Sequence, residues 1–376
     1  MSREVLLDRQ GRIVAVNMGG SGATDGYLPR INVNGQLKAP TTSFTYTLPS
    51  GVTTIPDQSL MNSFSESGLS GILNFSQITN IGNQGFMRGC AYCSNLTGVN
   101  LSSLSTLSRE GLRYTFANCN NLTGNIDLSR LQTIDPASLR YTFANTAITS
   151  IDLSSVNSIS SAVETSEPGY YEGSMECTFM GCSNLSSFNL SSLSTIGYMG
   201  MCDCFSGCSS LTSANLSSVT YVDEEGLSGT FGGCSALTSV DMSNLTAIGS
   251  YGLKNAFSGC SNLTSVNLSS LEEISDPADC GLEYAFCECT SLSSLSFPSF
   301  VWKDWYYYIE QEWDDESEDW IEYISGYVPL MTNMLYGVTG CTVHFKSSLQ
   351  STDFVNLPEV LNGFGGTNTT ILFDLP

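Results

Sequence analysis

A phrase of 26 residues recurs along most of this chain and limits its possible folds more than any other feature. The clearest copies read close to Phe-x-Gly-Cys-Ser-x-Leu-Thr-Ser-x-Asn-Leu-Ser-Ser-Leu and begin at Phe179, Phe205, Phe231 and Phe257, each 26 residues after the one before. Repeats of about 20 to 50 residues are typical of solenoids, in which each unit buries its apolar side only against its neighbours. The 376 residues are therefore expected to form one elongated domain.

The first part of each copy predicts a short helix. Leu253, Ala256, Phe257 and Cys260 occupy positions i, i+3, i+4 and i+7, which would place them on one stripe of a helix. We expect this stripe to face inward.

The second part of each copy predicts a short strand. Val266, Asn267 and Leu268 alternate between apolar and polar, so Val266 and Leu268 are expected to point inward and Asn267 outward. Stacked copies would then form a parallel sheet on one face, with the helices on the other.

This unit resembles that of the BspA-like leucine-rich repeat proteins, Ala-Phe-x-Gly-Cys-x-x-Leu-x-x-[Ile/Val]-x-[Leu/Ile]. The resemblance covers about residues 46–300 and a weaker copy at 335–345. The family commonly has Pro after the strand where this chain has Ser269-Ser270, which indicates a divergent branch. The resemblance implies an α/β solenoid, a leucine-rich repeat array with a parallel sheet on one face and short helices on the other. It also implies bacterial surface adhesins and host-matrix binders, and similar arrays occur in bacteriophage tail and receptor-binding proteins.

Departures from the repeat suggest four regions. Residues 1–45 are expected to be an N-terminal attachment segment with a possible hairpin over 5–16, and residues 46–300 the solenoid. Residues 301–334 are expected to be an aromatic and acidic insertion, and residues 335–376 a C-terminal capping segment. A smaller insertion, Ser160–Glu176, interrupts the array itself. Function in solenoids tends to reside on such insertions.

Charge and hydropathy exclude several partners. The chain has 36 acidic and 13 basic residues and a net charge of −23, which repels phosphate backbones and anionic bilayers. We therefore expect no nucleic-acid partner. No run of 18 apolar residues exists, so membrane insertion is not expected either. The N-terminal residues are charged where a signal peptide needs its apolar stretch. The resemblance to the BspA-like family nevertheless implies a location outside the cell. The expected location is extracellular, on a bacterial surface or on a phage particle.

The 14 cysteines favour packing over chemistry. Half of them occupy the inward slot of the repeat, where a small, soft side chain packs well: Cys93, Cys119, Cys182, Cys208, Cys234, Cys260 and Cys289. Zinc-finger spacing is absent and His344 is the single histidine, so no metal or other cofactor is expected. Oxidation of pairs in neighbouring coils, such as Cys177 with Cys202 or Cys204, depends on geometry.

Catalysis has little support in the sequence. Gly-x-Ser-x-Gly, P-loop and His-Glu-x-x-His motifs are all missing, and composition alone leaves only a carboxylate-pair glycosidase open. No catalytic residue is predicted, and the protein is not expected to be an enzyme.

Two sets of residues are candidates for ligand binding. The first is the outward strand position, which repeats at Asn189, Asn215, Asp241 and Asn267 and could meet sugar hydroxyls or an extended polypeptide. The alternative is that these stacked side chains satisfy one another and serve register and solubility.

The second set lies in the aromatic insertion, which holds all four tryptophans and reads as a protruding β-hairpin with an acidic tip. Its candidate contact residues are Trp305, Tyr308, Trp313, Trp320 and Tyr323. Exposed Trp and Tyr suit sugar stacking or a protein hot spot. Alternatively, these aromatics cover the open end of the array.

Two hypotheses for function follow. The first is a non-enzymatic recognition or adhesion module that binds a cell-surface glycan or protein through the aromatic insertion and the sheet face. The second is a structural or receptor-binding component of a bacteriophage tail. In that case the array is a spacer and residues 1–45 dock into the virion or another surface assembly.

Overall fold

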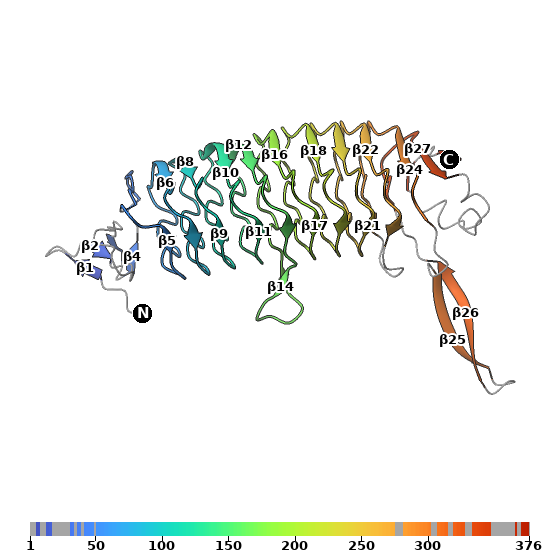
Figure 1. Cartoon of the computed structure of the whole chain (residues 1–376), viewed down its shortest axis with the longest axis horizontal. Helices are drawn as coiled ribbons and strands as arrows, with labels where there is room; N and C mark the ends of the chain where they lie inside the picture. The colour runs from blue at the N-terminus through green and yellow to red at the C-terminus, as the bar shows by residue number, and fades with distance from the viewer. Residues whose placement is uncertain are drawn as a thin grey trace.

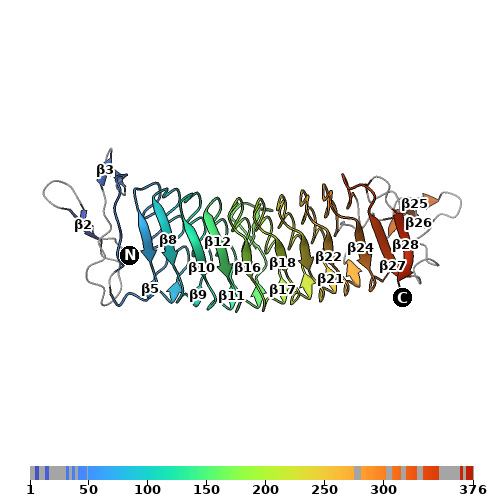
Figure 2. The ribbon, with the colours of Figure 1, turned by 90° about the horizontal axis from the view of Figure 1, so that it is seen from above.

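A computed structural model describes most of the repeat region and parts of both ends. The described residues are 5–7, 13–16, 31–33, 36–38, 41–48, 50–274, 281–301, 307–314, 319–327, 333–346, 365–366 and 370–375. The coils stack side by side into one elongated array (Figure 1; Figure 2).

The predicted strand of the repeat forms a ladder along one edge of the array, here called the long-strand ladder (Figure 1). Its strands are β6 (Gly71–Asn74), β8 (Leu96–Asn100), β10 (Thr123–Asp127), β12 (Ala147–Asp152), β16 (Ser187–Asn189), β18 (Ser213–Asn215), β20 (Ser239–Asp241), β22 (Ser265–Asn267), β24 (Ser294–Phe297), β27 (Thr342–Lys346) and β28 (Thr370–Leu375). All paired neighbours are parallel, in sheets of the order β6-β8, β10-β12-β16, β18-β20-β22 and β24-β27-β28. The predicted parallel sheet is confirmed.

A second parallel ladder, made of two-residue strands, lies along the opposite edge in Figure 1 and was not predicted. It consists of β5 (Thr54–Ile55), β7 (Asn80–Ile81), β9 (Thr106–Leu107), β11 (Thr133–Ile134), β13 (Ser158–Ile159), β17 (Thr195–Ile196), β19 (Tyr221–Val222), β21 (Ala247–Ile248) and β23 (Glu273–Ile274). The order is β5-β7-β9 and β11-β13-β17-β19-β21-β23. Two residues are too few to show an alternating pattern, which is why the sequence gives no sign of these strands.

The predicted short helices are wrong, because the described residues contain no helix. Their place is taken by runs of tandem turns, which we call the turn face. Within one run, every fourth residue is left-handed, with φ of 55° at Glu110, 56° at Tyr114 and 60° at Asn118. A four-residue period puts positions i and i+4 on the same side, as a helix does, so the apolar spacing alone could not separate the two.

On the turn face, backbone hydrogen bonds to the next coil alternate with backbone hydrogen bonds inside a turn of the same coil. The N–H groups of Leu112 and Phe116 donate to the carbonyls of Ser138 and Thr142 in the next coil, at 3.0 and 2.9 Å. The N–H of Thr115, between them, donates to the carbonyl of Leu112 at 2.9 Å. Each coil therefore satisfies its backbone through the next coil, as a sheet does, and the fold depends on stacking.

The Gly of the repeat phrase occupies a left-handed position. Gly207 has φ of 75°, and other coils place Asn118 or Asn145 at the same slot, with φ of 60° and 56°. Gly and Asn are the residues that adopt this conformation at least cost, which explains the residue types found here.

A column of phenylalanines fills the core. Consecutive rings from Phe143 to Phe286 are nearly parallel, with centroids 5.2 to 5.8 Å apart and interplanar angles of 3° to 14°. The seven repeat cysteines are all buried beside this column, as predicted. Each thiol also donates to a backbone carbonyl of the preceding coil, for example Cys234 Sγ to Phe205 O at 3.2 Å. Buried cysteine thus contributes both volume and a weak hydrogen bond.

The abundant Ser and Thr also have a structural role. Thr220 Oγ1 donates to the carbonyl of Ser194 at 3.2 Å, and Thr246 Oγ1 donates to that of Thr220 at 3.0 Å. A second row links Thr264 to Thr238 at 3.0 Å in the same way. These hydroxyls tie each coil to the one before it, which fixes the register of the stack.

Four antiparallel pairs lie outside the ladders. They are β1 (Val5–Leu7) with β2 (Ile13–Val16), β3 (Ile31–Val33) with β4 (Gln36–Lys38), β14 (Val163–Glu164) with β15 (Tyr171–Glu172), and β25 (Tyr307–Asp314) with β26 (Asp319–Tyr327). The hairpins predicted over 5–16 and in the aromatic insertion are confirmed. The β14–β15 and β25–β26 hairpins both project from the array (Figure 1).

Candidate binding surface

A shallow depression on the long-strand ladder brings together three of the predicted ladder residues. It has a volume of about 500 Å³ and spans β18, β20 and β22. Asn215, Asp241 and Asn267 line it together with the serines and the apolar residues that precede them: Ser213, Ala214, Ser239, Val240, Ser265 and Val266. Asn189 ends β16, whose residues pair with β12. The depression is an open surface lined about equally by polar and apolar atoms.

Each of the four predicted ladder side chains already accepts a hydrogen bond from a backbone N–H group. The Oδ1 atoms of Asn189, Asn215, Asp241 and Asn267 accept from the N–H two residues later, at 3.2, 3.0, 3.1 and 3.2 Å. Asn267 Nδ2 also donates to Asp241 Oδ1 at 3.3 Å. The same Asx turn ends each long strand from β6 to β22, so the residue type has a structural cause. The three asparagines remain exposed, and a ligand can still reach them.

The aromatic hairpin has a defined backbone register. Trp313 pairs with Trp320, Glu310 with Tyr323 and Tyr308 with Gly326. Trp305 and the acidic residues 315–318 lie outside the described residues. Binding by Trp305, Tyr308, Trp313, Trp320 and Tyr323 stays a prediction, as does their alternative role as a cap.

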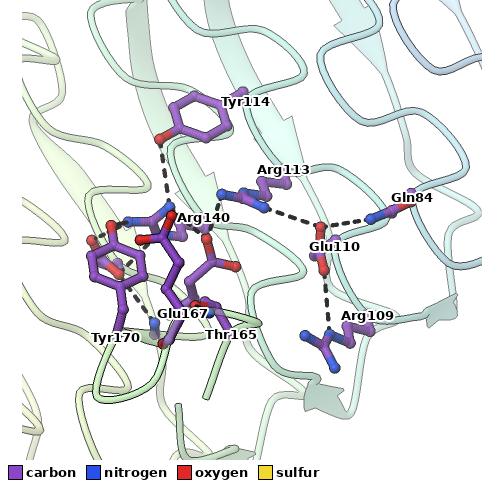
Figure 3. Close-up of polar contacts among 12 residues, drawn as sticks. Gln84, Arg109, Glu110, Arg113, Tyr114, Arg140, Thr165, Glu167 and Tyr170 are labelled. Carbon is purple, nitrogen blue, oxygen red and sulfur yellow. Dashed lines mark hydrogen bonds and ion pairs between the residues drawn. The ribbon is translucent and has the colours of Figure 1, made fainter. Parts of the chain in front are cut away.

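A buried charge cluster on the turn face was missed by the sequence analysis (Figure 3). Arg140 forms a two-pronged pair with Glu176, through Nε to Oε2 and Nη2 to Oε1, both at 2.8 Å. Its Nη1 donates to Glu172 Oε1 at 3.2 Å, and Glu172 also binds Arg113. Since Glu172 belongs to β15, these ion pairs fasten the β14–β15 hairpin to the array.

Burial shapes the protonation of this charge cluster. Burial disfavours the charged guanidinium, but hydrogen bonding to Glu176 and its negative charge outweigh this and raise the pKa of Arg140. Burial acts against ionised Glu110 as well, yet hydrogen bonds from Gln84 and Arg113 leave the pKa of Glu110 below its usual value. Arg140 and Glu110 are therefore charged at neutral pH.

Stacked tyrosines adjoin the charge cluster. The rings of Tyr114 and Tyr141 are 4.7 Å apart and within 9° of parallel. The guanidinium of Arg113 lies 5.4 Å from the Tyr114 centroid, and that of Arg140 lies 5.2 Å from Tyr141. The sequence contained a signal that could have predicted this stacking. The phrase Leu-Arg-Tyr-Thr-Phe-Ala occurs at 112–117 and again at 139–144, at the same position of the repeat.

The cysteines and His344 were the other candidates for chemistry in the sequence. The described cysteines, Cys177, Cys202 and Cys204 among them, are free thiols. His344 lies half-buried in β27, with Nδ1 2.8 Å from Asp374 Oδ1. Within the described ranges, no three His, Cys, Asp or Glu side chains gather as a metal site. No helix long and apolar enough to cross a membrane occurs in the described parts of the chain.

The family model described as the BspA type leucine rich repeat region matches in six copies, over residues 41–164, 175–278 and 254–306, which is more than half of the chain. No curated protein matches the sequence.

Three solved structures are similar in fold. A leucine-rich repeat protein from Bacteroides ovatus has 17% identity and a TM-score of 0.33, covering 98% of this chain and 97% of its own. A leucine rich cell surface protein from Faecalibacterium prausnitzii has 14% identity and a TM-score of 0.29, covering 93% of each chain. A leucine-rich repeat protein from Eubacterium ventriosum has 14% identity and a TM-score of 0.26, covering 66% of this chain and 73% of its own.

Proposed function

The chain belongs to the BspA-type leucine-rich repeat family, and we propose that it is a non-enzymatic recognition module that adheres to a protein or glycan on a cell surface. The observation that carries this proposal is the open depression on the long-strand ladder, which is lined by rows of Ser, Asn and Asp side chains. Enzyme sites prefer deep, mostly apolar pockets, whereas an open hydrogen-bonding surface suits an extended ligand.

The aromatic hairpin is the second contact surface of the proposal. Its register makes Trp313 and Trp320 direct cross-strand partners. Tryptophans supply a large contact area at low entropy cost, so a pair of them near the end of a projecting hairpin favours recognition. Adhesion also requires the array to be outside the cell, on a bacterial surface or on a particle that carries it. The phage-tail hypothesis stays a prediction from the sequence.

The test is binding of labelled protein to a panel of intact bacteria and animal cells. The variants are a deletion of residues 304–327 and the double substitution Trp313→Ala with Trp320→Ala. The matched control is Tyr221→Ala with Tyr336→Ala, two exposed tyrosines outside the hairpin.

We expect selective binding by the parent and the control, and a loss of at least tenfold in both hairpin variants. Binding that survives in both variants would exclude the hairpin and leave the sheet face as the contact surface. If the parent binds no cell, the adhesion proposal is wrong.

A further inference from the structure

The turn face carries a patch unlike the rest of the array surface. Between positions 41 and 300 the chain has six basic residues, Arg88, Arg109, Arg113, Arg130, Arg140 and Lys254, and five of them lie within three adjacent coils. We define the Tyr–Arg cluster as six residues joined by direct contacts: Arg88, Arg113, Tyr114, Arg140, Tyr141 and Tyr170. Figure 3 shows four of them, Arg113, Tyr114, Arg140 and Tyr170, on one face beside the β14–β15 hairpin.

Contacts within the cluster form one continuous stack. The Arg88 guanidinium lies 5.9 Å from the centroid of Tyr114, whose ring stacks on Tyr141. Arg140 donates from Nη2 to Tyr170 Oη at 3.1 Å, which ties the hairpin tyrosine to the same stack. Planar guanidinium and ring faces therefore continue across three coils and onto the hairpin.

Exposure in the cluster increases from the centre to the edge. Arg140 is buried, Arg113, Tyr114 and Tyr141 are half-buried, and Arg88 and Tyr170 are exposed, the latter by 48%. Tyr and Arg are enriched at the energetic centres of protein interfaces, where Ser, Glu and Asp are depleted. Because the inner side chains are already fixed by stacking and ion pairs, little conformational entropy remains to be lost on binding.

The charges of the cluster indicate what it binds. Glu110, Glu172 and Glu176 already neutralise Arg113 and Arg140. In contrast, no carboxylate among the described residues forms an ion pair with Arg88. One available guanidinium beside aromatic faces matches a single carboxylate next to an apolar side chain. A polyanion is disfavoured, since the net charge of −23 repels it.

We propose that the Tyr–Arg cluster is a second docking surface, which binds a protein segment bearing a carboxylate beside an aromatic or aliphatic side chain. This inference rests on the proposed recognition function and adds to it a site and a class of partner. Arg88 receives the carboxylate, and Tyr114 and Tyr170 contact the apolar neighbour.

The experiment uses a displayed library of random dodecapeptides, selected on the full-length protein. Selected peptides are then measured against Arg88→Glu with Tyr170→Ala. The matched control is Arg130→Glu with Tyr221→Ala, which changes an exposed arginine and an exposed tyrosine outside the cluster. Circular dichroism and thermal melting confirm that both variants keep the fold.

We expect selected peptides to carry Asp or Glu next to an apolar residue, and to lose at least tenfold in affinity for the cluster variant but not for the control. The proposal is overturned if no peptide is selected, if the peptides lack carboxylates, or if both variants bind alike. This assay needs no cells, so its failure is separate from failure of the adhesion test.

Discussion

At the scale of single residues, the Asn and Asp that end the long strands from β6 to β22 have a structural function that does not depend on any ligand. Asn215 Oδ1 accepts from the N–H of Ser217 at 3.0 Å, and neighbouring coils repeat this bond. The candidate ligand ladder is thus also the device that ends each strand. Loss of binding in an Asn→Ala variant would therefore have two possible causes.

The first prediction separates these two causes. Asn215→Ala removes the acceptor and should lower the free energy of unfolding by about 1 kcal/mol. Asn215→Asp keeps the acceptor and should lose less, with repulsion from the cross-strand partner Asp241 as its remaining cost. Urea unfolding followed by circular dichroism measures both. If Asn215→Ala and Asn215→Asp unfold alike, the Asx turn contributes nothing. If Asn215→Asp is stable but binds cells less well, the amide nitrogen contacts the ligand.

At the scale of elements, the β14–β15 hairpin depends on buried charge. The side chains of Arg140 and Glu172 are 5% and 6% exposed, and Glu176 is 12% exposed. Removing one partner of such a group leaves the others buried without compensation, which is far more costly than the net gain from the intact set.

The second prediction concerns this hairpin. Arg140→Met should lower the free energy of unfolding by about 3 kcal/mol, because Glu172 and Glu176 lose their shared counterion. The triple variant Arg140→Met, Glu172→Gln and Glu176→Gln should recover a large part of that loss. Arg130→Met, at an exposed arginine, should change stability by less than about 0.5 kcal/mol. Hydrogen exchange of residues 163–172 should rise in Arg140→Met and stay unchanged in Arg130→Met. Unchanged exchange in Arg140→Met would show that the ion pairs do not hold the β14–β15 hairpin on the array.

The second ladder, made of two-residue strands, and the turn face have conformations that the sequence of one coil cannot specify. Thr195–Ile196 is a strand only because Ser158–Ile159 and Tyr221–Val222 lie beside it in register. Likewise, the N–H of Phe116 finds its partner in another coil. Local sequence favours a helix at this point, and hydrogen bonding between coils decides against it.

At the scale of the whole molecule, six of the seven repeat thiols share one environment; the exception is Cys93, whose pKa is lowered to about 7, mainly by its hydrogen bond with Cys90 and also by Ser67. Burial raises the pKa of Cys234 and of Cys289 to about 12, and it raises the pKa of the other repeat thiols Cys119, Cys182, Cys208 and Cys260 as well. Burial favours the neutral thiol because the thiolate loses its hydration.

The third prediction follows from this shift. The folded state holds its thiol protons to higher pH than the unfolded state, whose pKa is near 9. The contribution of the thiols to stability is therefore complete below pH 9 and is lost as pH rises toward 12. Unfolding free energies measured from pH 8 to 11 should fall in the parent, and less steeply in Cys234→Ala with Cys260→Ala. Tyrosine and lysine titrate equally in both proteins, so identical slopes would refute the prediction.

The sequence by itself determined the solenoid and the direction of each strand residue. A 26-residue period leaves each coil no core of its own, and alternation at Val266, Asn267 and Leu268 fixes which side chains face inward or outward. The aromatic hairpin was also predictable, because its strands are local and alternate.

Only the tertiary structure decided between helix and turns, since periods of 3.6 and four residues select the same apolar positions over so short a stretch. Only it placed the Asx oxygens on backbone N–H groups. It also brought Arg140 to Glu172 and Glu176, which are 32 and 36 residues away in the chain. The ion pairs of Arg140 and the hydrogen bonds of the turn face arise from contacts between coils, and a coil read alone does not contain them.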